Sequence, residues 1–218
     1  MQLAKPIARR VTKKAAQSEA SIERLTEAAA RLFVSQGYRA TTLEQIAANA
    51  GYTKGVVYFH FGSKPALLLR LLEGVERYVV DEVIARIDTE GGTPVEQMVT
   101  FLHTQARLGV DRSAEVLLLL IMSLEFGDRE GDVSERIRAI YQKLHDVTER
   151  MVLAGQASGD FRTDVPGREL ATLVMALHDG TFLEWHRRKH YLNGPDLVRA
   201  MRSVILDGLA APSPASPG

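Results

Sequence analysis

Apolar residues along this chain recur at intervals of three and four positions, the spacing that places them on one face of an α-helix. Residues 18–36 show the pattern, and Gly37 follows them as a stop signal. The apolar positions of this first segment are Ile22, Leu25, Ala29, Leu32 and Phe33. No segment alternates as a half-buried strand does, and no internal repeat is present. The sequence therefore predicts an all-α fold.

A pair of short helices joined by a tight turn is predicted over residues 42–61. Thr42 can cap the first helix, and Gln45 lies three positions further on, as a capping box requires. Gly51 can end that helix in the left-handed conformation, and Thr53 can cap the second. Two short helices joined in this way form a helix-turn-helix, whose second helix enters the DNA major groove.

The rest of the chain keeps the helical spacing, interrupted by glycine, proline and capping residues. The helices expected there cover residues 63–88, 93–109, 113–126, 132–158, 166–190 and 195–209. The second of them has a strong start, with Thr93 as the cap, Pro94 at the first position and Glu96 at the third, as in a capping box. The first of them starts beside the helix-turn-helix and continues well past it, so we expect it to link two domains mechanically. The last eight residues, 211–218, are rich in proline and serine, which predicts a disordered tail.

The formal net charge is zero, but it is distributed unevenly. Residues 1–64 carry a net charge of +6 and residues 65–218 carry −6. A basic module joined to an acidic one is typical of a nucleic-acid-binding domain attached to a domain with another role. Five of the basic residues lie within residues 1–17, which predicts a mobile arm. Such an arm can follow DNA or simply keep the terminus in solution.

The residues around the predicted turn also resemble a known family. The pattern T-x-x-x-I-A-x-x-A-G-x-T-K-G-x-x-Y-x-H-F-x-S-K, which starts at Thr42, resembles the signature of TetR-type transcriptional regulators. The resemblance implies a homodimeric, all-helical, ligand-responsive repressor that binds a palindromic operator in double-stranded DNA. Together with charge and composition, it divides the chain into a flexible basic arm (1–17), a three-helix DNA-binding domain (18–64), a helical ligand-binding and dimerisation domain (65–210) and a disordered tail (211–218).

Eight residues are expected to contact DNA, on their chemistry and on the resemblance together. They are Thr42, Thr53, Lys54, Gly55, Val57, Tyr58, His60 and Lys64. A threonine at a helix start offers its hydroxyl and nearby N–H groups to a phosphate, and a lysine early in the recognition helix can donate to guanine. The resemblance makes the tyrosine, the histidine and the last lysine of this set phosphate contacts.

Four neighbouring apolar residues of the second short helix are expected either to contact DNA bases or to pack in the protein core. Of Val56 and Val57, one is expected to pack inward and the other to touch thymine methyl groups. Phe59 and Phe61 are both expected to pack in the core.

A small, largely apolar effector is expected among the helices between residues 65 and 183. Methionine and aromatic residues interleave there with a few polar groups, which are the materials of an apolar ligand site. The candidates are His103, Met122, Glu125, Phe126, Tyr141, His145, Met151, Met175, His178 and Asp179. A place in the core or on the surface is the alternative for each of them.

The resemblance also implies that the last two helices pair with those of a second copy in a four-helix bundle. Candidate residues for this homodimer interface are Leu173, Leu177, Phe182, Trp185, Met201 and Ile205. Several of them would fit the core of one subunit equally well.

Several classes of function find no support in the sequence. The chain has no cysteine, which excludes disulfides and thiolate metal sites. The longest apolar run is seven residues, too short to cross a membrane, so we expect a cytoplasmic protein. His186 and His190 are four positions apart, but the cations between them fit a helix C-terminus better than a metal site. We expect no metal, no other cofactor and, without a catalytic pair of carboxylates, no enzyme.

Two other interpretations stay open. One is an architectural or cell-division type of DNA-binding protein without a small ligand, which stabilisation by any small molecule would exclude. The other is an all-helical enzyme with an incidental helix-turn-helix, which failure to bind DNA at low salt would favour.

Overall fold

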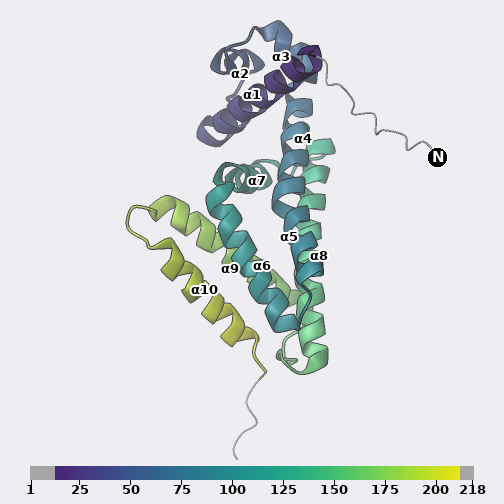
Figure 1. The fold of residues 1–218 in the computed structure, drawn as a ribbon, viewed down its shortest axis with the longest axis vertical. Helices are drawn as coiled ribbons and strands as arrows, with labels where there is room; N and C mark the ends of the chain where they lie inside the picture. Colours follow the sequence, from purple (N-terminus) through teal and green to yellow (C-terminus); the bar gives the residue numbers. More distant parts are fainter. Residues whose placement is uncertain (1–12, 212–218) are drawn as a thin grey trace, which may run out of the picture. The chain divides into compact units, whose positions relative to one another are not determined.

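Helices make up almost all of residues 13–211, the part of the chain that the computed structural model describes (Figure 1). Their bounds are α1 (Lys13–Gln36), α2 (Leu43–Ala50), α3 (Lys54–Phe61), α4 (Lys64–Val75), η1 (Glu76–Asp81), α5 (Glu82–Glu90), α6 (Pro94–Asp111), α7 (Ser113–Phe126), α8 (Asp132–Ser158), α9 (Gly167–Arg188) and α10 (Gly194–Leu209). Within the described residues, extended pairing is limited to one bridge between Phe161 and Ala210. The all-α fold is confirmed.

The helices form two compact units, Met1–Arg70 and Leu71–Gly218, so the division falls inside α4. The first helix begins at Lys13, five residues before the predicted start, because lysine, alanine and glutamine at residues 13–17 are good helix formers. The other residues of the predicted arm, 1–12, and residues 212–218 of the predicted tail lie outside the described residues.

In the first unit, α1 packs on α2 and α2 packs on α3. The buried apolar residues that join them include Leu25, Ala29, Phe33, Leu43, Ile46 and Val57. The predicted capping box is present, because the Gln45 N–H donates to Thr42 Oγ1 over 3.2 Å and the Thr42 N–H donates to Gln45 Oε1 over 2.8 Å. Gly51 has φ +77° and donates its N–H to carbonyl oxygens of α2. Glycine adopts this left-handed conformation without steric cost, because it has no Cβ, and it therefore ends α2 and makes the turn.

The helix that follows is continuous but not uniform, which the sequence analysis did not predict. Residues 76–81 form a π-helical segment, η1, between α4 and α5. The wider π turn adds a residue to the helix, and both Val79 and Val80 are buried in it. Because a π turn holds more residues than an α turn, the adjacent Val79 and Val80 are less than about 100° apart around the axis, and both fit the buried side.

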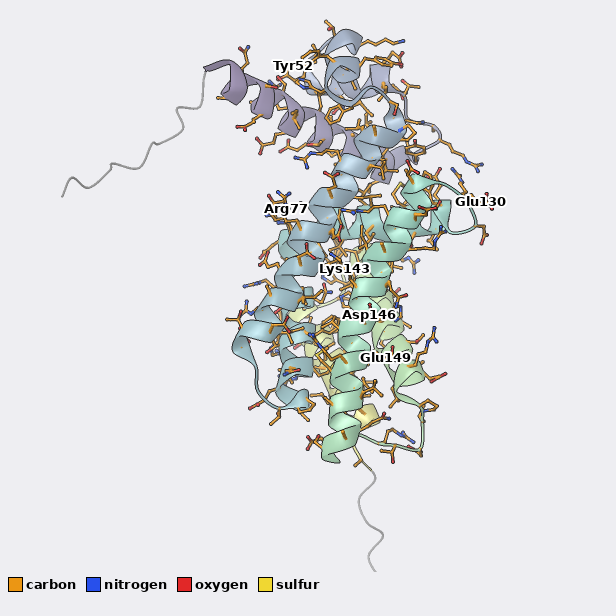
Figure 2. The ribbon with its side chains drawn as sticks, turned by 90° about the vertical axis from the view of Figure 1, so that its right-hand side faces the viewer. Tyr52, Arg77, Glu130, Lys143, Asp146 and Glu149 are labelled. Atoms are coloured by element: carbon orange, nitrogen blue, oxygen red, sulfur yellow. The ribbon has the colours of Figure 1, made fainter. Side chains whose placement is uncertain are left out.

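A buried carboxylate on η1 is paired with two cations of α8. Glu76 is buried and forms ion pairs with Arg136 and Lys143. Lys143 Nζ also lies 3.1 Å from Asp81 Oδ1, and its hydrogen bonds to Glu76 and Asp81 raise its pKa. Figure 2 shows Lys143 on α8, in a row with Asp146 and Glu149. The π segment is thereby fixed to α8 by charge as well as by packing.

The second unit is built around α8 and α9, with α6 and α10 packed against them. The predicted capping box of α6 is present: the Glu96 N–H donates to Thr93 Oγ1 over 3.3 Å, and the Thr93 N–H donates to Glu96 Oε2 over 2.8 Å. α9 and α10 form a hairpin and lie side by side (Figure 1).

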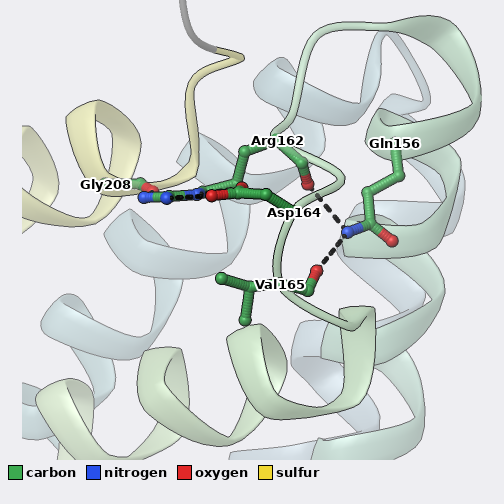
Figure 3. Close-up of polar contacts among 5 residues, drawn as sticks. All are labelled: Gln156, Arg162, Asp164, Val165 and Gly208. Carbon is green, nitrogen blue, oxygen red and sulfur yellow. Dashed lines mark hydrogen bonds and ion pairs between the residues drawn. The ribbon is translucent and has the colours of Figure 1, made fainter.

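A polar network fixes the connection between α8 and α9 (Figure 3). The Gln156 side chain donates to the carbonyls of Arg162 and Val165, over 2.8 and 2.9 Å. Arg162 is held by Asp164 and donates to the Gly208 carbonyl near the end of α10, over 3.5 Å. This loop therefore ties the ends of three helices together.

Candidate nucleic-acid interface and effector cavity

The first turn of α3 is open to solvent. Thr53 is the N-cap residue, yet its side chain makes no capping hydrogen bond. Thr53, Lys54 and Gly55 are exposed, and Tyr58, one turn further on, is 44% exposed. Residues 54, 55 and 58 share one face of the helix. A duplex that met this face would find a hydroxyl, an ammonium and a phenol group together.

Lys54 already has a partner within the protein. Its ammonium forms an ion pair with Glu44 of α2 and lies 5.3 Å from the centre of the Tyr58 ring. The hydrogen bond between the two charged groups raises the pKa of Lys54 and lowers the pKa of Glu44. Both side chains are exposed to solvent, where water and salt weaken such pairs. A nucleic acid that contacts Lys54 must compete with this carboxylate or rearrange it.

Lys64 lies in a different environment, at the first residue of α4. Its Nζ donates to the carbonyl oxygens of Tyr38 and Thr41, over 2.8 and 2.7 Å, and lies 4.3 Å from the centre of the Tyr38 ring. These contacts attach α4 to the turn between α1 and α2. The ammonium that was expected to hold a phosphate therefore also holds the backbone that leads into α2.

Two more of the expected contacts lie at the edges of this surface. Thr42 is exposed at the start of α2, and its hydroxyl accepts the capping hydrogen bond, which leaves the O–H able to donate. His60 is half-buried, with its ring centre 5.1 Å from that of Phe59.

Two expectations for the apolar residues of α3 need correction. Val57 is fully buried, so Val57 is the valine that packs inward, and the half-buried Val56 is the one closer to solvent. Phe59, expected in the core, is 82% exposed. Val57 and Phe61 are four positions apart and share a face, whereas Phe59 is about 200° away from each of them around the helix. Helical spacing in the sequence therefore already predicts Phe59 on the side opposite Val57, contrary to the expectation of a core position.

A cavity of about 600 Å³ lies in the second unit, between α6, α9 and α10. Most of its wall is apolar, from residues that include Val116, Phe182, Trp185, Leu197, Val198 and Met201. Its volume falls within the range of small-molecule sites in proteins.

Polar groups on the cavity wall are few, and two of them are buried. Gln105 of α6 is 3% exposed, and its Nε2 has no hydrogen-bond partner among residues 13–211. His178 of α9 is also buried, with its Nδ1 2.9 Å from Asp179 Oδ1. Gln105 was not among the predicted ligand residues. Its place four residues after Phe101 and three before Leu108 is on the apolar stripe of α6, which could have identified it.

Of the ten predicted ligand residues, His178 alone lines this cavity. Met122, Phe126, Met151 and Met175 are buried core residues. His103 is exposed, with Nε2 3.3 Å from Arg202 Nη1, and Glu125 pairs with Arg129 at 3.8 Å. Helical periodicity identifies buried positions, but it does not show where the packing leaves a space.

The other three predicted ligand residues, Tyr141, His145 and Asp179, do not line the cavity. Tyr141 hydrogen-bonds to Ser123, and its pKa is raised by burial and by the negative charge of Asp179. Asp179 contacts His178, as described above, and His145 is half-buried on α8.

The apolar residues expected at a dimer interface fall into two groups. Phe182, Met201 and Ile205 are buried within one subunit, and the half-buried Trp185 lines the cavity. Leu173 and Leu177 on α9 are exposed, as is Val204 on α10. The exposed group provides apolar side chains on both helices of the α9–α10 hairpin.

Residues 13–211 hold no group of three or more His, Cys, Asp or Glu residues placed to bind a metal ion. Among the described helices, none has both the length and the apolar character needed to cross a membrane.

Comparison with known proteins agrees with both units. The family model described as "Bacterial regulatory proteins, tetR family" matches residues 25–71, and the model described as "Tetracyclin repressor-like, C-terminal domain" matches residues 118–191. The crystal structure of the MbdR regulator from Azoarcus sp. CIB is 42% identical, with a TM-score of 0.79 over 87% of this chain and 98% of that one.

Two further proteins extend the comparison. The HTH-type transcriptional repressor KstR2 of Rhodococcus jostii is 26% identical over 86% of this chain and 90% of its own length. The crystal structure of AibR, solved with isovaleryl coenzyme A and operator DNA, shares the fold: it is 21% identical, with a TM-score of 0.74 over 84% of this chain and 97% of that one. The chain described here therefore belongs to the TetR family and is a DNA-binding transcriptional regulator.

Proposed function

We propose that this protein is a homodimeric repressor that binds a two-fold symmetric operator and leaves it when a small, largely apolar effector occupies the second unit. The observation that carries the proposal is the solvent-exposed start of α3. Thr53, Lys54 and Gly55 are exposed there, and so is Tyr58 one turn further on. In helix-turn-helix proteins the residues at this end of the second helix meet base edges.

The residues of this surface divide into reading and positioning contacts. Lys54 can donate to the acceptors of guanine, and Gly55 lets the backbone approach the groove closely. Thr42, Tyr58 and His60 are proposed to bind phosphates, which positions the helix without specifying sequence. Lys64 supports them by holding the α1–α2 turn through Tyr38 and Thr41.

A dimer follows from the number of base pairs that one helix can read. A single recognition helix reads too few base pairs to distinguish its operator from the competing sites of a genome. Two helices of a dimer on a palindromic operator read twice as many base pairs. Exposed Leu173, Leu177 and Val204 supply an apolar surface for this contact on α9 and α10. We expect Leu177→Lys to shift the purified protein toward monomer in sedimentation analysis, with the helical content unchanged. Exposed Leu153→Lys on α8 is the matched control.

The effector is proposed to occupy the cavity between α6, α9 and α10. The effector can shift the equilibrium between the DNA-bound and the released conformation only by the difference between its binding free energies for the two conformations. The continuous helix from α4 through η1 to α5 is the proposed link, because it belongs to both units.

The test is selection of bound duplexes from a random DNA pool by the purified protein at moderate salt. Enrichment of an inverted repeat is the expected result, and it supplies the probe for effector experiments. Binding that is strongly salt-dependent but enriches no sequence would overturn the operator proposal and favour an architectural role.

A further inference from the structure

One face of α9 forms a continuous wall of the effector cavity, and its character changes along the helix. The lining residues on this face recur at helical spacing and are His178, Thr181, Phe182, Trp185 and Lys189. His178 and Phe182 are buried, Trp185 is half-buried and Lys189 is exposed. Lys189 follows His178 by eleven positions, which is about 16 Å along a helix axis. The cavity wall therefore runs from a buried end at His178 to an end at Lys189 that is open to water.

The middle of this wall is aromatic. The ring centres of Phe182 and Trp185 are 6.2 Å apart. Phe182 closely approaches α6, because a Cβ at Gly109 would lie 3.1 Å from its ring, and Trp185 Nε1 would lie 3.3 Å from a Cβ at Gly194. Both glycines also line the cavity. They leave room for the two rings, which present an apolar, aromatic surface to a ligand.

Lys189 is the cation of the cavity wall that is available to a ligand. Among the described residues, no Asp or Glu lines the cavity, and the other lysine or arginine that does, Arg107, lies 3.5 Å from Glu82. Lys189 forms no ion pair with any carboxylate of residues 13–211, whereas Arg188 beside it pairs with Glu184 at 3.1 Å. The side chain is exposed, and its flexible four-carbon stem lets the ammonium group reach an anion at the open end.

The chain around the open end is positive, although the C-terminal part of the protein is acidic. Residues 184–199 contain four Lys or Arg and two Asp or Glu, a net charge of +2, within residues 65–218 that together carry −6. At the buried end, the Asp179 carboxylate lies 2.9 Å from His178 Nδ1 and matches any positive charge on that ring. A carboxylate placed there would lose its hydration without gaining a partner. At Lys189 it stays in contact with water and meets a cation.

We propose that the cavity binds an apolar aromatic monocarboxylate, with its ring against Phe182 and Trp185 and its carboxylate at Lys189. The aromatic wall selects the body of the ligand, and the lysine selects its charge. A neutral molecule of the same shape keeps the apolar contacts but loses the ion pair, and a cation is repelled. The inference rests on the effector role proposed above and specifies the ligand class for the same site.

Three probes with one apolar body test the charge preference: 4-butylbenzoate, 4-butylbenzamide and 4-butylbenzylamine, which is protonated at pH 7. Trp185 is the only tryptophan of the chain, so its fluorescence reports binding in the cavity of the full-length protein. We expect the benzoate to bind about fivefold more tightly than the benzamide at low salt, as a partly exposed ion pair allows, and the amine to bind most weakly. The preference should shrink as salt rises. Equal or tighter binding of the benzamide, or no fluorescence change with any probe at millimolar concentration, would overturn the proposal.

The variant that tests the cation is Lys189→Met, which removes the charge and keeps an unbranched side chain. We expect its affinity for the benzoate to fall about fivefold, and its affinity for the benzamide to stay within about twofold of the wild type. Lys189→Arg keeps the charge and should retain the preference for the benzoate. Both variants change an exposed side chain, so we expect the melting temperature of the wild type.

The matched control is Arg187→Met, which removes the same charge from an exposed side chain that does not line the cavity. Both positions lie at the end of α9, so any effect that acts through the helix dipole is shared. We expect the control to keep the preference for the benzoate. An equal loss in Arg187→Met and Lys189→Met would assign the preference to the positive charge of residues 184–199 as a whole and overturn the role of Lys189.

Failure of this inference can be told apart from failure of the proposed function. The fluorescence titration needs no DNA, and release of the selected operator is measured separately. Binding of the benzoate with the expected preference but without any release would keep the carboxylate site and overturn its role as the effector site. Release by neutral apolar compounds, without a preference for the benzoate, would keep the effector role and overturn the carboxylate site.

Discussion

Two sets of polar side chains, one in each unit of this protein, have opposite environments. On α3 of the first unit, Lys54 and its partner Glu44 are exposed, and the energy of their ion pair is small because water competes for both. In the second unit, Glu76 and Gln105 are buried, where water cannot replace a lost partner. The same kind of substitution should therefore change binding in the first region and stability or ligand specificity in the second.

The difference suits the two tasks. A DNA-binding surface has to exchange partners with phosphates and bases, so weak internal pairs are an advantage. A ligand that enters the mainly apolar cavity of the second unit gives up its contacts with water, so a polar group that finds no partner there weakens its binding. Four substitutions test this contrast, starting with the largest expected effect.

Glu76→Ala should have the largest effect on stability. The change leaves Arg136 and Lys143 without their shared carboxylate, and breaking a buried ion pair from one side is strongly destabilising. Both cations are partly exposed, so we expect a loss of about 2 kcal/mol in the free energy of unfolding, below the upper range for fully buried pairs. Urea denaturation of the full-length protein measures it. Asp146→Ala, further along α8, is the control and should stay within about 0.5 kcal/mol of the wild type.

Lys64→Met should lower the stability of the first unit by about 1–2 kcal/mol, because the Tyr38 and Thr41 carbonyls lose a charged donor. Since the turn before α2 is then less fixed, affinity should fall for all DNA sequences alike. Hydrogen exchange of α2 and α3, together with binding to the selected operator and to random DNA, measures both effects. A change of sequence preference without loss of protection would mean that Lys64 reads bases.

Lys54→Ala should leave stability almost unchanged but reduce the preference for the operator over random DNA. Each good base contact contributes about 1–3 kcal/mol of discrimination, and the surface ion pair that is lost contributes little to folding. Competition binding at constant salt measures the preference. Equal weakening on operator and random DNA would assign this lysine to a phosphate instead.

Glu44→Gln should have the smallest effect, and it should increase affinity. The pKa of Glu44 is lowered by its hydrogen bond to Lys54, so the carboxylate is charged at pH 7 and repels the DNA backbone. Neutralising it should tighten DNA binding by about twofold to fivefold at low salt, and less as salt rises. The ion pair itself forms above the ordinary pKa of Glu and is lost only as the pH falls through the lowered value, so the increase should disappear in acid. Weaker binding at pH 7 would show that Glu44 orients Lys54 for its base contact.

The amino-acid sequence by itself determined most of the helices, and the ends of those that carry a capping box or a glycine turn, because these depend on local chemistry. The capping boxes at Thr42 and Thr93 and the glycine turn at Gly51 are present as predicted, since each involves residues only a few positions apart. The helix-turn-helix and the family follow from one short segment for the same reason.

Tertiary structure decided which side chains face which surroundings. Helical spacing alone could have placed Val57 inside and Phe59 outside, but it could not show that the space between α6, α9 and α10 stays open. Nor could it show that Gln105 lines that space without a partner, or that α8 supplies the cations around Glu76. These features depend on residues from helices far apart in the sequence, and the volume left between packed helices is set by all of their side chains together.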